Sequence, residues 1–553
     1  MDATTIEDVL DYVGSYYEKK RKPSSKLIRL DDESAYCVLC AAAFLGRFAK
    51  MDGFQAQRLF VRMRTSGVRT ENELRSWIDE TFCRVNTRRW DSSRKRAQEF
   101  LEAEIKVFAP SVEFFGPVED RPSARTDALQ CPGVIFGKGC PPEYPPLLAV
   151  FNSRKPRRVC PDSSWLDAMR CFLRGMDRGG IGLAGSTGTL TYDLASALAL
   201  RLNFLQLLIA PFPLFGADRQ LFTIFEETAK TLPTISCMVD GAPCRGKLPM
   251  RCRDRLLAAM SDFHLVLEIR SGGNLLAVLE QIQSKSPRPH FVLTPDTPRT
   301  SSGGNLTLLK KFPEHAVGFK ASRPQEPVQA EAAGAANSFS SSKKASRECS
   351  LWRGVKLARD THLFHYTRGC VGPWPGETYR QYLLDLLDAG LLSTGGSALA
   401  SLARIAREGL LRASCHMIRG KIPVVSWSSV PPHKLFLMRT WRRPFARWNV
   451  EPYGVALRRD ILRPLGAKPA IYGSEEVYSK LPDSEKYRFQ LSRPRPGAAW
   501  RQEREWRIAN DLLLTEIKPD QGFFFVQTAR EAERLYGCTD PGLPVIAMSE
   551  QDF

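Results

Sequence analysis

The segment Cys252–Ile282, CRDRLLAAMSDFHLVLEIRSGGNLLAVLEQI, has the residue pattern of a strand followed by a loop and then a helix. An apolar run, His264–Ile269, passes through Arg270 into a small-residue loop, and helical spacing of apolar residues follows. A Gly/Ser loop at a helix N-terminus presents backbone N–H groups and the positive end of the helix dipole, which suits a phosphate group. We therefore expect this segment to bind phosphate through Ser271, Gly272, Gly273 and the nearby Arg253.

Two earlier segments repeat this pattern. The first, LLAVFNSRKPR (Leu147–Arg157), is an apolar run that ends in Asn152, Ser153 and Arg154. The second, GIGLAGSTGTLTYDLASALAL (Gly180–Leu200), breaks into a loop before its helix. Three such loops in order, spaced as βαβ units, predict a parallel sheet whose loops converge at the carboxyl ends of adjacent strands. The further candidate phosphate-binding residues are Ser153, Arg154, Gly185, Ser186, Thr187 and Gly188.

These motifs resemble the DNA-processing protein A (Smf) family, within the SLOG superfamily of Rossmann-like nucleotide-binding domains. The likeness rests on Phe136, Lys138 and Gly139, on Ser153-Arg154, and on the segment Arg251–Asn274. It covers about a third of the chain and implies a Rossmann-like fold that binds a nucleotide or single-stranded nucleic acid. The chain departs from the family pattern at Asn152, where a Gly usually precedes Ser-Arg. It also departs at Gly185–Gly188, which replaces a Gly-x-x-x-Gly-Ile-Asp run.

The composition is that of a globular protein with a polyanionic partner. The 553 residues carry a formal net charge of +19, which favours nucleic acid or a nucleotide as partner. The 14 cysteines are scattered without disulfide-framework spacing, as is usual for reduced thiols in a cytoplasm. We predict neither a membrane span nor a metal site, because no apolar run is long enough and no His or fourth Cys stands at zinc-ligand spacing near Cys237, Cys244 and Cys252. The oligomeric state stays open, and a homo-oligomer is among the states that the sequence allows.

The chain is expected to be an α/β multidomain protein with four parts. Residues 1–110 show helical apolar spacing and form a helical N-terminal region; its five predicted segments are Ile6–Tyr17, Ser34–Phe48, Gly53–Arg64, Glu71–Phe82 and Ser92–Val107. Residues 111–320 form the Rossmann-like parallel-sheet domain. Residues 321–350, poor in aromatic and branched apolar side chains, form a flexible linker. Residues 351–553, with short strands around two early helices, form an α+β domain.

Two motifs of the C-terminal domain resemble ADP-ribosyltransferase-like domains of the DarT and abortive-infection type. They are FHYT at Phe364–Thr367 followed by SLARIAREGLL at Ser401–Leu411, and VVSWSS at Val424–Ser429 followed by EREWR at Glu503–Arg507. The resemblance implies NAD as a substrate. A carboxylate beside the ribose would stabilise the developing oxocarbenium charge, and polar side chains would position the substrate. The candidate catalytic residues are Glu505, Glu503 and His365, and the candidate substrate-binding residues are Tyr366, Ser426, Ser428 and Tyr472.

The stretch Arg439–Trp448 of this domain mixes cationic and aromatic residues, as nucleic-acid grooves do. We expect nucleic-acid contacts from Arg442, Arg443 and Arg447, although a solvated loop packed by its two tryptophans explains the same composition.

Three functions follow from these motifs. The first is a bacterial defence or toxin-type protein whose middle domain senses a nucleotide or single-stranded nucleic acid and whose C-terminal domain cleaves NAD or transfers ADP-ribose. The second is a non-catalytic DNA-binding protein of the DNA-processing type. The third is a SLOG-type nucleotide hydrolase, whose usual GGxGTxxE signature is not intact, because Gly188-Thr189 is followed by Asp193 and not by a Glu at the expected place.

Overall fold

The computed structural model describes two compact units. The described residues are 27–49, 53–82, 86–110, 134–140, 144–155, 163–176, 180–215, 232–239, 247–294, 302–320, 361–370, 372–388, 396–415, 418–436, 441–442, 447–491 and 504–548. The first unit spans residues 1–157 and 162–325 together with Gly376–Leu387, and the second unit contains most of the chain after the predicted linker. That linker, 321–350, and the predicted helix Ile6–Tyr17 lie outside the described residues.

The first unit is built on a ten-stranded sheet in the order β1-β2-β3-β7-β6-β5-β4-β8-β9-β10. In this order, every neighbouring pair from β7 through β6, β5, β4, β8 and β9 to β10 is parallel. Strands β1, β2 and β3 extend the β7 edge in antiparallel pairing. The strands are β1 (Leu27–Arg29), β2 (Lys106–Pro110), β3 (Ile135–Lys138), β4 (Leu147–Phe151), β5 (Gly182–Ser186), β6 (Gln206–Ile209), β7 (Thr234–Ser236), β8 (Phe263–Val266), β9 (His290–Leu293) and β10 (Ala316–Phe319). The parallel strands are buried on both faces, which explains their continuous apolar runs.

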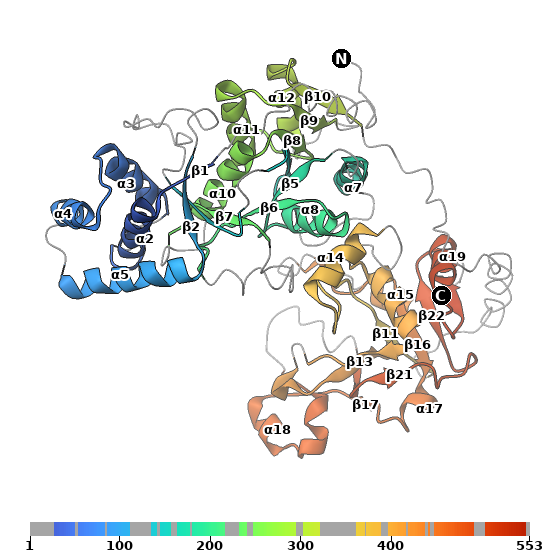
Figure 1. The fold of residues 1–553 in the computed structure, drawn as a ribbon. Coiled ribbons are helices and arrows are strands. Elements are labelled where there is room, and N and C mark those ends of the chain that lie inside the picture. The colour runs from blue at the N-terminus through green and yellow to red at the C-terminus, as the bar shows by residue number, and fades with distance from the viewer. Residues whose placement is uncertain are drawn as a thin grey trace. The chain divides into compact units, whose positions relative to one another are not determined.

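Helices cover both faces of this sheet (Figure 1). They are α7 (Ser164–Met176), α8 (Leu190–Arg201), α10 (Lys247–Met260), α11 (Asn274–Lys285) and α12 (Gly303–Lys311). Helix α7 packs against α8, α10 packs against α11, and α11 packs against α12. The strand order runs one way from β4 to β7 and the other way from β8 to β10, and right-handed crossovers in two opposite directions place their helices on opposite faces of the sheet. The chain runs from β4 outward to β7 and then returns to β8, so β4 and β8 flank the topological switch point of the sheet. Ligands of open α/β sheets bind at this point, outside the carboxyl ends of the strands.

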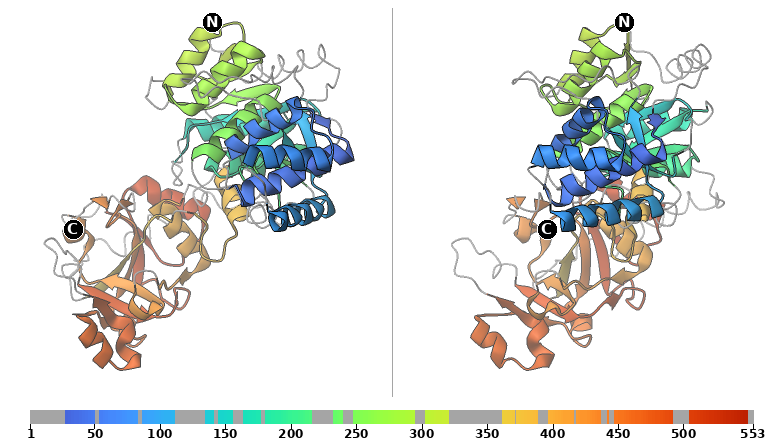
Figure 2. Two further views of the ribbon diagram at one scale, coloured as in Figure 1. Left: turned by 90° about the vertical axis from the view of Figure 1, so that its left-hand side faces the viewer. Right: turned by 60° about the vertical axis from the view of Figure 1, so that its left-hand side comes forward.

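The N-terminal region belongs to the same unit as the sheet. Its helices are α2 (Asp32–Arg47), α3 (Gly53–Thr65), α4 (Glu71–Phe82) and α5 (Thr87–Glu102), close to four of the five predicted helical segments. The region is not purely helical, however, because β1 and β2 pair with each other and β2 pairs with β3 of the central sheet. The fifth predicted segment therefore ends earlier than expected, and Lys106–Pro110 is a strand. Figure 2 shows these helices from two further sides.

The second unit contains a seven-stranded sheet in the order β17-β20-β13-β11-β16-β22-β23. Its neighbours are antiparallel except for β22 and β23. The strands are β11 (His362–Tyr366), β13 (Val424–Ser428), β16 (Gly454–Arg458), β17 (Lys468–Pro469), β20 (Glu505–Ala509), β22 (Gly522–Val526) and β23 (Val545–Ala547). The smaller strand pairs are β12 (Leu410–Leu411) with β21 (Leu512–Leu513), β14 (Trp441–Arg442) with β15 (Arg447–Trp448), and β18 (Ile471–Gly473) with β19 (Phe489–Leu491).

The helices of the second unit are short. They are α15 (Ala398–Glu408), α16 (Pro432–Phe436), α17 (Arg459–Leu462), α18 (Glu475–Lys480) and α19 (Ala529–Cys538), with two 3-10 turns at Arg419–Lys421 and Asp483–Arg488. Helix α14 (Tyr379–Leu387), which the sequence analysis assigned to the C-terminal domain, groups with the first unit and packs on α8. The architecture is thus that of a multidomain α/β protein. No helix in the described ranges combines the length and apolarity that a bilayer span requires.

Two buried histidines and one half-buried histidine should make stability depend on pH. Burial lowers the pKa of His290 on β9, and of His362 and His365 on β11, to about 4. Their pKa in the unfolded chain is near 6.5, so between about pH 6.5 and pH 4 the unfolded state binds more protons than the folded state. Stability should therefore be fully present above this window and fall on acidification through it. Urea midpoints at a series of pH values test this; midpoints that stay constant or rise from pH 7 to pH 5 would contradict it, and His290→Gln should flatten the dependence in the first unit.

Candidate functional site

Two of the predicted loops meet at the switch point of the first unit. Strands β4 and β8 are parallel neighbours that end together at Phe151 and Val266. Beyond them, the Ser153 hydroxyl accepts a hydrogen bond from the Arg270 backbone N–H at 3.0 Å. The Ser153 N–H in turn donates to the Glu268 carbonyl at 2.8 Å. The loops after β4 and after β8 are therefore joined directly at the carboxyl edge of the sheet.

Helix α11 begins at this junction with its N-terminus available to an anion. Its N-cap is Gly273, which provides no side-chain hydrogen bond to the first turn. The first N–H groups of an α-helix have no partner within the helix and carry the positive end of its dipole. Ser271 and Gly272 in front of the helix are exposed, and Gly272 adopts a φ of +68° that favours glycine. The turn thus leaves the helix end open towards solvent.

Two exposed cations lie in the same pair of loops. Arg154 follows Ser153 in the chain, and Arg270 precedes the α11 turn. Lys155 is less available, because its ammonium group forms an ion pair with the Glu268 carboxylate. The chain then continues into Pro156, Arg157 and Arg158, which lie outside the described residues. Cationic side chains beside an uncapped helix N-terminus form an arrangement that can bind phosphate oxygens.

A second Ser-Gly-Gly-Asn sequence, at Ser302–Asn305, lies against the first one and was missed by the sequence analysis. The Gly304 N–H donates to the Ile269 carbonyl at 2.9 Å, and a side chain at Gly303 would come within 3.1 Å of the Ser271 hydroxyl. Asn305 is fully buried; its amide donates to the carbonyls of Leu267 and Leu293 and accepts from the Ile269 N–H. Because this motif supports the loop after β8, its repetition in the sequence was the available signal.

The loop between β5 and α8 does not offer its expected phosphate-binding groups to a ligand. The Ser186 hydroxyl donates to the Ile209 carbonyl at 2.7 Å, and Ser186 is fully buried. The Thr187 hydroxyl and the Gly188 N–H both donate to Asp193 Oδ1, at 2.8 and 3.3 Å. Gly185 is closely packed, since a Cβ there would lie 2.7 Å from the Ser196 hydroxyl. The carboxylate of Asp193 therefore occupies the position in which we expected an anionic ligand.

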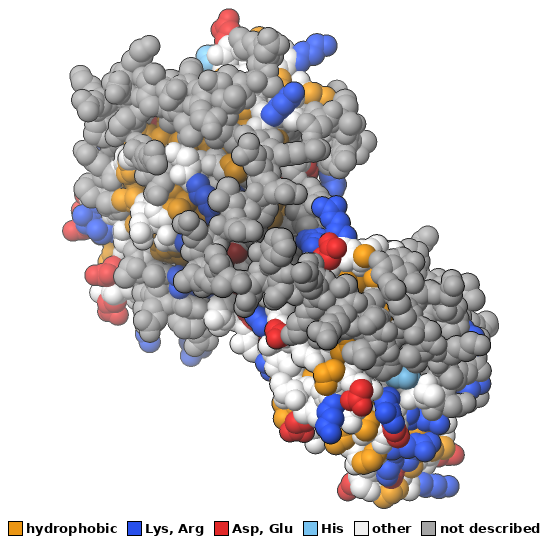
Figure 3. Space-filling model, turned by 90° about the vertical axis from the view of Figure 1, so that its right-hand side faces the viewer, with side chains coloured by type: hydrophobic (Ala, Val, Ile, Leu, Met, Phe, Trp, Pro, Cys, Tyr) orange, Lys and Arg blue, Asp and Glu red, His pale blue; other side chains and the backbone are white. Residues whose placement is uncertain are grey.

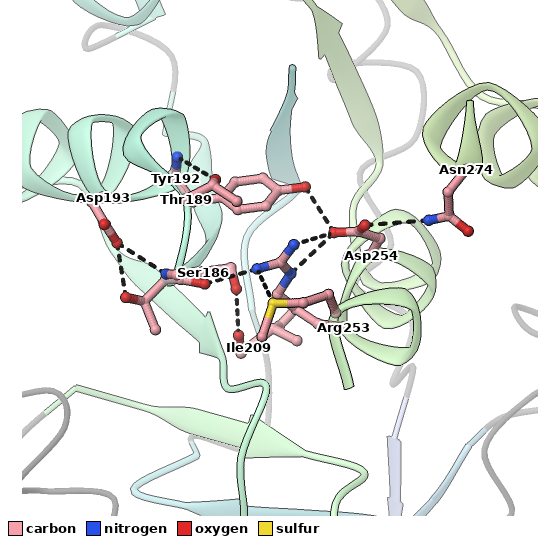
Figure 4. A network of polar contacts seen from close by, with 11 residues as sticks. Ser186, Thr189, Tyr192, Asp193, Ile209, Arg253, Asp254 and Asn274 are labelled. Atoms are coloured by element: carbon pink, nitrogen blue, oxygen red, sulfur yellow. Dashed lines mark hydrogen bonds and ion pairs between the residues drawn. The ribbon is translucent and has the colours of Figure 1, made fainter. Parts of the chain in front are cut away.

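Arg253 likewise forms contacts within the protein. Its side chain is 3% exposed, its Nη1 donates to the Thr187 carbonyl at 2.8 Å, and its Nη2 lies 2.7 Å from Asp254 Oδ1. Asp254 also accepts hydrogen bonds from the Tyr192 hydroxyl and from the Asn274 amide. Figure 4 shows this network, which connects the start of α8 with α10 and with the first residue of α11. Arg253 is thus a structural residue behind the site rather than a direct phosphate ligand.

Helix α14, which follows the predicted linker in the sequence, contacts the same network. The Tyr379 hydroxyl donates to Asp193 Oδ2 at 2.9 Å, and Arg170 on α7 donates to the Leu387 carbonyl at 3.1 Å. Burial raises the pKa of Asp193 above its ordinary value, and the hydrogen bonds from Thr187, Tyr379 and Gly188 oppose this shift. The carboxylate is therefore held at Oδ1 by the β5–α8 loop and at Oδ2 by Tyr379, which fixes the β5–α8 loop.

In the second unit, several predicted residues gather on one face of the sheet. Ser426 pairs with Arg507 and Ser428 pairs with Glu505 in the register of β13 and β20. The Ser426 hydroxyl donates to Glu505 Oε1 at 2.9 Å, and Arg507 Nε donates to the same oxygen at 2.9 Å. Arg507 is 1% exposed and also donates to the Phe489 carbonyl at 2.6 Å. Glu505 is thus a part-buried carboxylate in an ion pair with a buried arginine.

His365 lies on the opposite face from this pair. Successive strand residues alternate between faces, and Phe364 pairs with Ser428, so Tyr366 shares the face of Ser426 and His365 does not. The His365 ring packs edge-on against Trp427 at 5.7 Å, and its Nδ1 lies 2.9 Å from the Ser426 carbonyl. Tyr366 donates from its hydroxyl to the Val430 carbonyl at 3.0 Å. Among the predicted residues of the NAD site, His365 therefore does not lie on the face that carries Ser426 and Glu505.

The remaining candidate residues of the second unit lie outside the face that carries Ser426 and Glu505, or outside the described residues. Tyr472 on β18 pairs with Gln490, which contacts Arg507. Arg442 and Arg447 pair across the short hairpin of β14 and β15. Glu503 and Arg443 lie outside the described residues. Among the residues that the structure describes, no cluster of three or more His, Cys, Asp or Glu side chains could hold a metal ion.

Charges on the visible surface of the second unit are mixed in sign (Figure 3, lower part). Exposed or partly exposed ion pairs join Arg419 to Glu475, Lys468 to Glu485 and Lys486 to Asp483. Each pair neutralises its own cation locally, so these residues do not form a uniform basic surface.

Comparisons with known proteins include structural likenesses to DNA processing protein A from two organisms. No family model matches the chain, and no curated protein matches it in sequence. DNA processing protein A from Helicobacter pylori, described with a single-stranded DNA binding mode, is similar at 18% identity and a TM-score of 0.28, over 36% of this chain and 88% of that one. DNA processing protein A from Streptococcus pneumoniae is similar at 14% identity and a TM-score of 0.34, over 53% of this chain and 95% of that one.

Proposed function

We propose that the first unit binds the phosphate groups of single-stranded nucleic acid at the carboxyl edge of β4 and β8. The observation that carries this proposal is the hydrogen bond from Arg270 N–H to the Ser153 hydroxyl, which joins the two loops of the switch point. This junction sets the exposed Arg154 and Arg270 and the uncapped N-terminus of α11 at one edge of the sheet. The net charge of +19 favours a polyanion over a single small anion.

Single-stranded DNA is the first ligand to test. It is the ligand named for the Helicobacter pylori protein and fits the DNA-processing interpretation of the sequence motifs. A flexible single strand can follow a loop edge, whereas a duplex presents a stiff rod. In this function the protein needs no catalytic residue, since the α11 N-terminus and the arginines only position phosphates.

Binding should weaken steeply as salt is added. Each phosphate that a cation neutralises releases condensed counterions, so the logarithm of affinity should fall linearly with the logarithm of salt, with a slope of about −0.7 for each contact on a single strand. Fluorescence anisotropy with a labelled oligonucleotide across a salt series measures the slope. An absence of binding at low salt, or an affinity that does not change with salt, would overturn the proposed function. Competition with a free nucleotide shows whether a mononucleotide suffices.

A second candidate function is action on NAD in the second unit, with any defence or toxin role depending on it. The observation that favours it is the contact of the Ser426 hydroxyl with the part-buried Glu505, on the face that also carries Tyr366. Two features weigh against it: His365 lies on the other face, and Arg507 binds both oxygens of Glu505. Incubation of the protein with NAD, with and without single-stranded DNA, tests this candidate by the release of nicotinamide.

A further inference from the structure

Asn152 has an unusual environment at the switch point. It directly follows β4, is 4% exposed, and donates from its Nδ2 to the Thr191 hydroxyl at 3.2 Å. Its Oδ1 is buried and has no hydrogen-bond partner among the described residues. A buried carbonyl oxygen without a donor is costly, so such an atom in a folded protein calls for a partner that arrives from outside the chain.

The position of Asn152 links it to the proposed phosphate site. The next residue, Ser153, is the one that bonds the Arg270 N–H. Thr191, the hydrogen-bond partner of Asn152, lies in the first turn of α8. The adjacent Tyr192 is joined through Asp254 to Asn274 at the start of α11. Asn152 is therefore hydrogen-bonded to the first turn of α8, which the network in Figure 4 connects with the first residue of α11.

We propose that Asn152 determines ligand specificity by accepting a hydrogen bond from a donor group of the nucleotide whose phosphate binds at α11. The inference rests on the proposed function and extends it from phosphate binding to the rest of the nucleotide. The shared chemistry is an N–H or O–H donor in the same nucleotide as the bound phosphate. Two sources supply it: an amine or imide of the base, and the 2′-hydroxyl of a ribose. A strand of abasic deoxyribose units has the same phosphates but neither donor.

The test compares ratios of affinity rather than affinities. The labelled strands are oligo(dA), oligo(dT), oligo(rU) and an abasic deoxy strand of equal length, and the proteins are wild type and Asn152→Ala. In wild type, at least one donor-bearing strand should bind about tenfold or more tightly than the abasic strand, because an unmet buried acceptor costs affinity. In Asn152→Ala this ratio should fall several-fold. Preference for oligo(rU) over oligo(dT) assigns the donor to the 2′-hydroxyl, and equal binding of the two assigns it to the base.

Gln206 offers a matched control. It is also a buried amide with an unpartnered oxygen, but it begins β6 at the amino edge of the sheet, away from the proposed site. Gln206→Ala should leave the ratio unchanged, and thermal melting of both variants shows whether each is folded. If Asn152→Ala destabilises the fold, Asn152→Ser replaces it, at a temperature at which that variant is folded. If the Asn152 variants still bind every strand but do not alter the ratio, the inference is overturned. A buried water that satisfies the oxygen would give this result. Absence of binding to all strands overturns the proposed function itself.

Discussion

A Glu505→Gln variant should lose about 3 kcal/mol or more of the unfolding free energy of the second unit. The reason is the buried Arg507 guanidinium, which is 1% exposed and has Glu505 as its ion-pair partner on the same strand. Arg507 donates to both Glu505 oxygens, at 2.9 and 3.2 Å. A glutamine amide removes the negative charge and can turn a donor towards the guanidinium, which leaves a buried cation uncompensated. Urea unfolding of wild type and variant measures the loss.

The exposed pair of Arg419 and Glu475 provides the control. Both side chains are more than half exposed, so Glu475→Gln should cost about 1 kcal/mol or less. A double-mutant cycle of Glu505→Gln with Arg507→Met should give a coupling energy of about 2 kcal/mol, because the two groups contact each other. A cost for Glu505→Gln as small as that for Glu475→Gln would mean that the carboxylate is available to a substrate. The candidate NAD chemistry would then gain weight.

Reversing two charges at the switch point should produce the largest loss of nucleic-acid affinity. Arg154→Glu/Arg270→Glu replaces two exposed cations by anions and should lower affinity for single-stranded DNA about a hundredfold at low salt. The salt dependence should also become shallower by about 1.4 in slope, which corresponds to two lost contacts. Anisotropy titrations of both proteins give the two numbers.

The matched control for total charge lies on α5 of the same unit. Arg89→Glu/Lys95→Glu makes the same change of net charge at two exposed residues of this helix, which also carries Arg88, Arg94 and Arg96. Its affinity should change much less than that of the switch-point variant. Equal losses in the two variants would show that net charge alone governs binding, and a larger loss in the α5 variant would move the interface to that helix.

The sequence predicted three strands of the parallel sheet, β4, β5 and β8, and the loops that follow them, because their signals are local. Each apolar run is buried in the sheet, and each Gly/Ser loop is followed by a helix. The antiparallel strands β1 and β2 could not be predicted in the same way. They are short, and β1 pairs with a partner about eighty residues away, so only tertiary structure defines them.

The predicted site residues differed in outcome for a related reason. A Gly/Ser loop indicates that N–H groups are available, but it does not show which carboxylate reaches them. Asp193, in the first turn of α8, accepts from Thr187 and Gly188, whereas α11 has no such residue and its turn stays open. The signal was the acidic residue shortly after Thr189, the N-cap of α8. In the second unit, the adjacent positions of His365 and Tyr366 in one strand already required that their side chains point to opposite faces.

The most direct test of the account is hydrogen–deuterium exchange of the whole chain with and without a single-stranded oligonucleotide. The first N–H groups of α11 have no partner within the helix and should exchange quickly in the free protein. A bound phosphate would accept hydrogen bonds from them. The account predicts slower exchange on binding in peptides that cover 153–155 and 270–276, and no change in α5 (Thr87–Glu102). Unchanged exchange at 270–276 together with protection confined to α5 or to the second unit would contradict it.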